Sequence, residues 1–234
     1  MAVAGTWAFA EIAEHVRAGG TQAFDDFALA WIGAHQRPSL QKVALELTAL
    51  GTGSVVLMIA LIAALFLALG PHRYRALLLV AATAGGVLLN GVLKLIFDRP
   101  RPEVFTWGTH VVSSSFPSGH AMNSVIVYST VAYLAARLES RVWMRWLTLG
   151  VAVVVIVLVC LSRLYLGVHY PSDVAAGALV GLAWAAFCMS GLEAARVFGR
   201  RFQRVPPPSR PPPPTPPRSG GPDHDPLTPP RARD

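Results

Sequence analysis

The sequence predicts an all-α integral membrane helical bundle with about five transmembrane helices and an amphipathic helical segment at its N-terminus. Of its 234 residues, 53% are hydrophobic and only 14% are charged, whereas soluble domains carry about 25% charged residues. The apolar residues also occur in runs close to the roughly 20 residues that a helix needs to cross a bilayer. Backbone groups in lipid have no water to bond, so these runs are predicted to be helices.

Five such runs define a predicted membrane domain over residues 51–192. The predicted spans are Gly51–Leu69, Ala76–Phe97, Gly119–Leu138, Val142–Leu161 and Pro171–Leu192. Small residues recur in two of them, over Ala81–Gly86 and Ala175–Gly181. Because small side chains let neighbouring helices approach closely, we expect tight helix contacts at these two stretches.

The two ends of the chain differ from this domain. Residues 1–50 hold apolar positions interrupted by charges such as Glu11, Asp25 and Asp26. This pattern predicts one or two amphipathic helices lying at the membrane interface. Residues 193–234 are basic and proline-rich, which predicts a disordered tail.

Arginines set the predicted orientation, because cytoplasmic loops of membrane proteins are enriched in them. They lie in the loops after the first and third spans and behind the fifth: Arg73, Arg75, Arg141, Arg145, Arg196, Arg200, Arg201 and Arg204. These loops and the C-terminal tail are therefore predicted to be cytoplasmic. The loops Asp98–Ser118 and Ser162–Tyr170 and the N-terminal segment then face the extracytoplasmic side. The high alanine, arginine and proline content indicates a GC-rich bacterial genome, so we expect a bacterial plasma membrane.

Composition argues against two kinds of partner. The net charge is +7, but the basic residues lie in short loops and the tail, so no nucleic-acid partner is predicted. The two cysteines, Cys160 and Cys188, lie inside apolar runs and lack the spacing of a metal site. They are predicted to be small buried hydrophobic residues.

A first polar cluster follows the second span. Lys94 lies at its end, and Asp98-Arg99-Pro100-Arg101-Pro102 comes next. The prolines are expected to end the helix and to fix an extended exit. Taken alone, Lys94 is typical of an interfacial anchor, and Arg99 and Arg101 are typical of ordinary loop charges.

A second polar cluster, Phe116-Pro117-Ser118-Gly119-His120, opens the third span. A proline in the first turn favours a helix start, and the free N–H groups of a helix N-terminus form an anion site. Gly119 lets the backbone approach a ligand, and Ser118 adds a hydroxyl donor. In this setting His120 is predicted to donate a proton beside a bound oxyanion.

A third polar cluster joins the fourth and fifth spans and contains Ser162, Arg163, His169 and Asp173. Pro171 is predicted to start the helix, which places Asp173 in its first turn, where a carboxylate is favourable. From there Asp173 is close enough to accept a hydrogen bond from one ring nitrogen of His169. Such a bond fixes the imidazole tautomer and raises the nucleophilicity of the other nitrogen.

The predicted topology brings the three clusters to one face of the membrane. Around the two histidines they collect three cations, Lys94, Arg101 and Arg163. Fixed cations suit the charge on a transferring phosphoryl group. No Asp, Glu or His spacing typical of a metal site accompanies them. The predicted chemistry is phosphoryl transfer with no metal and no other cofactor.

The three clusters resemble the signatures of the type 2 phosphatidic acid phosphatase (PAP2) family of membrane lipid phosphatases. These signatures stand here as Lys94 with Arg101-Pro102, as Pro117-Ser118-Gly119-His120, and as Ser162-Arg163 with His169 and Asp173. The resemblance covers about residues 51–192. Family members usually have six spans, so either the start of the chain is truncated or the amphipathic segment replaces the first span.

The resemblance implies a role for each residue. His169 would attack phosphorus and carry a transient phosphohistidine, and Asp173 would orient it. His120 would protonate the leaving oxygen and then activate the water that releases phosphate. The phosphoryl oxygens would be held by Lys94, Arg101, Ser118, Gly119 and Arg163.

The expected partners are membrane lipids and a lipid phosphate or isoprenoid diphosphate as substrate. Vanadium haloperoxidases share these motifs but are soluble, and the apolar spans argue against that alternative. A phosphatase for a soluble sugar phosphate is a second alternative. A catalytically silent membrane lipid-binding or transport protein is a third, and the presence of all three catalytic candidates disfavours it.

Overall fold

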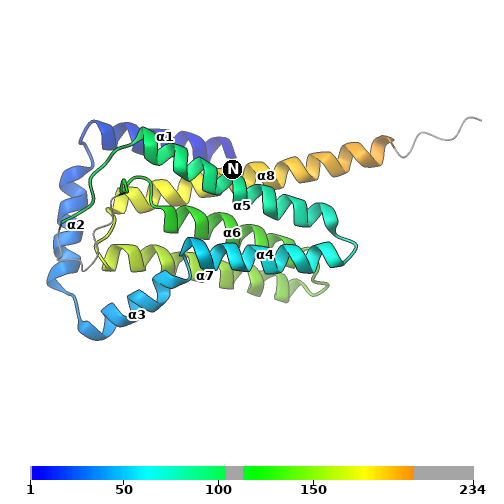
Figure 1. Cartoon of the computed structure of the whole chain (residues 1–234), viewed down its shortest axis with the longest axis horizontal. Helices are drawn as coiled ribbons and strands as arrows, with labels where there is room; N and C mark the ends of the chain where they lie inside the picture. Colours follow the sequence, from blue (N-terminus) through cyan, green and yellow to red (C-terminus); the bar gives the residue numbers. More distant parts are fainter. Residues whose placement is uncertain (1, 104–112, 203–234) are drawn as a thin grey trace, which may run out of the picture. The chain divides into compact units, whose positions relative to one another are not determined.

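The computed structural model of the chain describes residues 2–103 and 113–202, with side chains through Ala194. These residues form eight helices and contain no strand (Figure 1). The helices are α1 (Ala2–Arg17), α2 (Gln22–Ala34), α3 (Pro38–Ala49), α4 (Gly53–Leu69), α5 (Arg73–Ile96), α6 (Gly119–Ala136), α7 (Val142–Tyr165) and α8 (Pro171–Phe202). The predicted all-α class is confirmed.

The five predicted spans correspond to α4 through α8. The largest difference in a boundary is at the end of α8, which continues to Phe202, past Leu192 where its span was predicted to end. The predicted disordered tail therefore begins with helical residues. The rest of that tail, residues 203–234, lies outside the described residues.

The predicted number of five spans can be set against the helices of the described residues that are long and apolar enough to cross a membrane. Three segments are long and apolar enough to cross a membrane by themselves: Arg73–Ile96, Val142–Tyr165 and Pro171–Ala194. A fourth is formed by α3 and α4 together, which meet at a bend of 44°. The count of five is thus not confirmed, and α6 is the one predicted span that is not among these segments.

Helix α6 is the central helix of the bundle. It packs against α4, α5 and α7, and its Ser124 and Thr130 are fully buried. A helix that is covered by other helices has little contact with lipid, so polar residues on it are sheltered from the hydrocarbon. This packing explains why a helix in the middle of a membrane bundle has a more polar sequence than its neighbours.

Glycines allow α8 to approach α6 closely. A Cβ atom on Gly177 would lie 2.5 Å from the carbonyl oxygen of Ser118, and one on Gly181 would lie 2.8 Å from that of Met122. In the other small-residue stretch, a Cβ on Gly86 would lie 2.5 Å from Ile126 Cδ1. The tight contacts expected from the small residues are present, and they fix the start of α6 against α8.

The N-terminal segment is helical, as predicted, but it forms three helices, α1 to α3, instead of one or two, and the first two pack on the bundle. Helix α1 lies along α8, where a Cβ on Gly5 would be 3.1 Å from the Ala183 Cβ. The Phe9 ring stacks on Phe116, just before α6, with centroids 6.0 Å apart. Helix α2 lies across the end of the bundle at which α6 and α8 begin (Figure 1), and Asp25 and Leu29 on it are fully buried.

Candidate active site

The three sequence motifs meet at one end of the bundle, each carried by a helix terminus. Lys94 lies in the last turn of α5 and Arg163 in the last turn of α7. His120 is in the first turn of α6, and Asp173 is in the first turn of α8. His169 lies in the short connection between α7 and α8. The juxtaposition expected from the topology is therefore present.

His169 is buried between a carboxylate and a guanidinium group. Only 1% of the residue is exposed. Its Nδ1 lies 3.5 Å from Asp173 Oδ2, and its Nε2 lies 3.4 Å from Arg101 Nη1. The Nδ1 contact is at ion-pair distance and longer than a good hydrogen bond, and Nδ1 has no hydrogen-bond partner among the described residues. His169 and Asp173 are thus close together, as predicted, but the hydrogen bond expected between them is not formed.

The environment of His169 favours its neutral form. Burial lowers the pKa of the imidazole to about 4, and the charges of Arg163 and Arg101 act in the same direction. The neighbouring carboxylate of Asp173 opposes this shift without overcoming it. At neutral pH the imidazole therefore has a free lone pair, which is the form that acts as a nucleophile.

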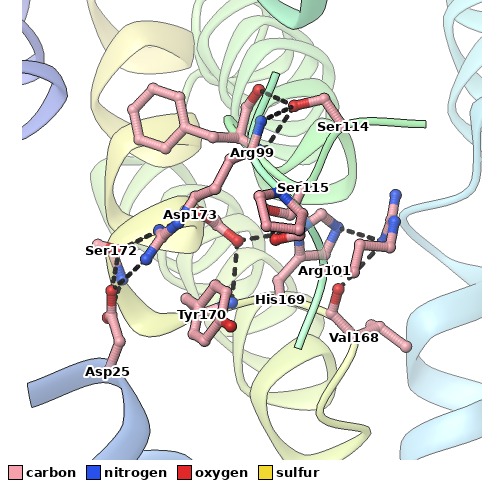
Figure 2. A network of polar contacts seen from close by, with 12 residues as sticks. Asp25, Arg99, Arg101, Ser114, Ser115, Val168, His169, Tyr170, Ser172 and Asp173 are labelled. Carbon is pink, nitrogen blue, oxygen red and sulfur yellow. Dashed lines mark hydrogen bonds and ion pairs between the residues drawn. The ribbon is translucent and has the colours of Figure 1, made fainter. Parts of the chain in front are cut away.

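Asp173 is held through both carboxylate oxygens (Figure 2). Its Oδ2 accepts a hydrogen bond of 2.9 Å from the Tyr170 N–H, and its Oδ1 accepts one of 2.6 Å from Arg99 Nη1. Its main-chain carbonyl accepts a 3.0 Å hydrogen bond from the Ser118 N–H. That last bond joins the second motif directly to the third.

Three cations surround the two histidines. Arg101 donates to the Val168 carbonyl at 3.0 Å and to Ser113 Oγ at 3.1 Å, and Lys94 Nζ lies 3.4 Å from the same Oγ. Arg163 donates from Nη1 to Thr48 Oγ1 at 2.7 Å. Its Nε is buried and has no acceptor within the described part of the chain. Converging cations with an unused donor form a site for an anion with several oxygens.

The second motif supplies a further free donor. Ser118 occupies the N-cap position of α6, but its hydroxyl makes no capping bond and, among the described residues, has no partner. Pro117 precedes this cap, so the expectation that it lies in the first turn is wrong by two positions. Gly119 lies against Asn90, whose Oδ1 would be 3.2 Å from an added Cβ. His120 is within electrostatic reach of His169 and of the three cations.

Two charged residues of the site were missed by sequence reasoning. The interpretation of Arg99 as an ordinary loop charge is wrong, because its side chain is only 10% exposed and bridges two carboxylates. One of them is Asp173 and the other is Asp25 of α2, at 2.9 Å from Nη2. Asp25 also accepts a 3.0 Å hydrogen bond from the Ser172 N–H, 147 residues away in sequence. The proline after Arg99 could have indicated that this arginine is held in a fixed position, whereas nothing in the sequence around Asp25 indicated that its side chain is buried.

The bend between α3 and α4 also borders the site. Thr48, near the end of α3, accepts the Arg163 hydrogen bond described above. A Cβ on Gly51 would lie 3.2 Å from His120 Cδ2 and 2.5 Å from Val159 Cγ1. The chain can therefore pass beside His120 at this point only because residue 51 has no side chain.

The chain as a whole is similar to known proteins. The model of the PAP2 superfamily matches residues 75–196, just over half of the chain. Phosphatidylglycerophosphatase B of Bacillus subtilis is 36% identical over 151 residues, which are 63% of this chain and 72% of that protein. An undecaprenyl-diphosphatase of Sulfolobus acidocaldarius is 34% identical over 137 residues, 56% of this chain and 62% of that protein.

Solved structures agree with the sequence matches. The crystal structure of a transmembrane PAP2-type phosphatidylglycerolphosphate phosphatase from Bacillus subtilis is similar with a TM-score of 0.76 and 29% identity, covering 88% of this chain and 98% of that one. LpxE of Aquifex aeolicus shares the fold, with a TM-score of 0.57 and 21% identity over 71% of this chain and 95% of that one. The resemblance predicted from the three motifs is confirmed, and the chain belongs to the PAP2 superfamily.

Proposed function

We propose that this chain is an integral membrane phosphatase that hydrolyses a lipid phosphate or prenyl diphosphate through a phosphohistidine on His169, without a metal. Its family makes it a phosphatase. The observation that carries the mechanism is the buried, neutral imidazole of His169 held between Asp173 and Arg101. Relatives named for phosphatidylglycerophosphate and undecaprenyl diphosphate support a substrate whose phosphate is attached to a lipid.

In the first half of the proposed reaction, His169 Nε2 attacks phosphorus. A nitrogen–phosphorus bond forms while the bond from phosphorus to the leaving oxygen breaks, and His120 gives its proton to that oxygen. A bound phosphate dianion favours the protonated form of His120 that this step requires. Asp173 stabilises the positive charge that develops on the His169 ring.

In the second half, water replaces the histidine. His120, now neutral, takes a proton from the water as it attacks phosphorus. The nitrogen–phosphorus bond breaks, its electron pair returns to His169 Nε2, and inorganic phosphate leaves. The protein then has the same protonation state as at the start.

The three cations support a mechanism that needs no metal. Lys94, Arg101 and Arg163 reach one another electrostatically and lie beside His169 and His120. Together with the free hydroxyl of Ser118 and the start of α6 at Gly119, they supply the positive charge and hydrogen-bond donors that a phosphoryl group requires in its transition state.

We also propose that the site faces the extracytoplasmic side of a bacterial plasma membrane, with the C-terminus in the cytoplasm. Helix α5 begins at Arg73 and ends next to Lys94, so its arginine-rich start and the site lie at opposite ends. Arg141, at the start of α7, lies at the other end of that helix from Arg163. The positive-inside rule then places the arginine-rich end in the cytoplasm.

The direct test is phosphate release by the purified protein in detergent with EDTA present. The substrates are a prenyl diphosphate, phosphatidic acid, phosphatidylglycerol phosphate and a soluble sugar phosphate. We expect EDTA-resistant release with a preference for a lipid substrate, and a transient phosphoenzyme after alkaline quench. Preference for the sugar phosphate would overturn the lipid assignment, and no release from any substrate by a folded sample would favour a catalytically silent protein.

The pKa of His169 predicts an unusual pH dependence. Because burial lowers that pKa from 6.5 to about 4, the neutral nucleophile persists as the pH falls through the range in which an exposed histidine is protonated. We expect kcat/KM, divided by the fraction of substrate in its dianionic form, to stay high below pH 6.5 and to fall only as the pH nears about 4. An acidic limb at or above pH 6.5 would show that His169 is not buried in the working enzyme.

A further inference from the structure

Asp25 is a buried carboxylate that the proposed mechanism does not use. It is fully buried on α2, a helix that lies outside the three family motifs. Its Oδ1 accepts the Ser172 N–H at 3.0 Å, and its Oδ2 accepts the Ser172 hydroxyl at 2.5 Å and Arg99 Nη2 at 2.9 Å. A carboxylate is costly to bury, so a fully buried one is kept where its charge is matched by partners.

We propose that Asp25 is a positioning residue for the nucleophile and acts through Arg99 on Asp173 and His169. The four side chains form a continuous line, in which the Asp25 carboxylate contacts the Arg99 guanidinium, Arg99 contacts the Asp173 carboxylate, and Asp173 faces the His169 ring (Figure 2). Asp25 itself touches neither histidine. This proposal rests on the proposed function, since it assigns a role in the same site.

The first part of the proposed role is geometric. Arg99 Nη1 holds Asp173 Oδ1 at 2.6 Å and thereby sets the rotation of the carboxylate, which leaves Oδ2 directed at His169. Arg99 is in turn held by the two carboxylates, by Ser172 Oγ at 2.8 Å and by the Tyr170 ring, 4.1 Å from the guanidinium carbon. Removing the Asp25 carboxylate leaves Arg99 Nη2 held only by Gln22 Oε1, at 3.1 Å, among the described residues.

The second part is electrostatic. An Arg99 paired only with Asp173 would neutralise the carboxylate that stabilises positive charge on His169. With Asp25 present, the arginine shares its charge between two carboxylates, and the group of three keeps one net negative charge. Burial lowers the pKa of Arg99, but the bonds of Arg99 to Asp25 and Asp173 raise that pKa by more than burial lowers it. The pKa is therefore above its usual value, and the arginine stays charged. The net charge therefore remains available to His169.

The test is the variant Asp25→Asn, which keeps the size of the side chain and removes its charge. Asp26→Asn is the matched control, because Asp26 is the next residue, is exposed and bonds only to Gln22 within the described structure. We expect kcat of D25N to fall about 10- to 100-fold, the range expected when a catalytic group is slightly misplaced. KM should stay within about threefold, because Asp25 contacts none of the three phosphate-binding cations, and D26N should behave as wild type.

The direction of a pH shift separates this role from a merely structural one. His169 is surrounded by Asp173, Arg101, Arg163 and His120, and burial is the largest cause of its lowered pKa. Removing the negative charge of Asp25 lowers that pKa further, whereas loosening of the site would admit water and raise it. In D25N we expect the acidic limb of kcat/KM, and the His169 protonation followed by ¹⁵N-histidine NMR in detergent, to move to lower pH. A move to higher pH would overturn the proposal.

The path through Arg99 is tested by combining variants. If Asp25 acts only through Arg99, then the double variant Asp25→Asn with Arg99→Gln should have a kcat no lower than Arg99→Gln alone. A double variant whose loss equals the product of the two single losses would show that Asp25 acts independently, and would overturn the proposal.

Two further results would also overturn it. One is D25N with the kcat of wild type. The other is a loss of activity in D25N fully explained by fewer active sites, counted from the phosphoenzyme formed per protein chain. Failure of the proposed function is separate, because it would appear as activity retained in His169→Ala or as a wild-type protein without turnover. In the latter case the NMR titration of His169, assigned with the H169A variant, still decides whether Asp25 controls the charge on the histidine.

Discussion

His169→Ala is expected to abolish phosphate release while leaving the protein folded. The variant removes the only atom that the proposed mechanism joins to phosphorus, so no phosphoenzyme can form. Losing the nucleophile of a covalent mechanism typically lowers kcat by about 10⁴-fold or more. The assay is phosphate release in detergent with EDTA, together with trapping of labelled phosphoenzyme after alkaline quench.

The matched control is His15→Ala. His15 is an exposed histidine of α1 whose ring lies 3.8 Å from a Glu11 carboxylate oxygen, far in sequence from the three motifs. It should retain wild-type turnover. Activity of H169A near that of the control would remove His169 as the nucleophile. Because His169 is nearly free of hydrogen bonds to the rest of the chain, thermal unfolding in detergent should confirm that the variant is folded.

Gly177→Ala is expected to lower both the stability of the bundle and its turnover. The added Cβ would lie 2.5 Å from the Ser118 carbonyl oxygen and 3.3 Å from the Ser118 N and C atoms. These are backbone atoms at the start of α6, so no flexible side chain can move aside. Forcing a methyl group into a close-packed contact costs about 1–3 kcal/mol and sometimes more.

The displacement in Gly177→Ala would also act on the site. The backbone that must move carries Ser118 and leads directly to His120, and it includes the Ser118 N–H that donates to Asp173. Gly191→Ala in the same helix is the matched control, because nothing lies within 4 Å of its added Cβ. Its unfolding temperature should equal that of wild type or exceed it slightly, since alanine favours helix by up to about 1 kcal/mol over glycine. Equal stability of the two variants would contradict the tight α6–α8 contact.

Much of the site could be predicted because its signals are local. His169 and Asp173 are four residues apart across a helix start, so their pairing follows from chain geometry. Lys94, His120 and Arg163 each lie at the end of a helix whose limits are set by its own apolar residues and by nearby prolines. The ends of membrane helices lie at one face of the membrane or at the other. Predicting which motifs meet therefore requires only deciding at which face each motif lies.

The burial of individual helices within the bundle could not be predicted in the same way. Helix α6 was expected to be a span like the others, and the structure shows that α4, α5 and α7 pack against it. Whether a polar residue such as Ser124 faces lipid or another helix depends on the packing of the bundle, and a hydropathy pattern does not contain that information.

The sequence alone therefore predicted the five apolar helices and the motifs at their ends, because hydrophobic runs, prolines and short spacings act over a few residues. Only the tertiary structure revealed that the N-terminal segment enters the site through Asp25 and Thr48. Asp25 and its neighbour Asp26 look alike in sequence, yet one is fully buried and the other is exposed. The difference arises because burial of a carboxylate depends on which distant partners, here Arg99 and Ser172, pack against it.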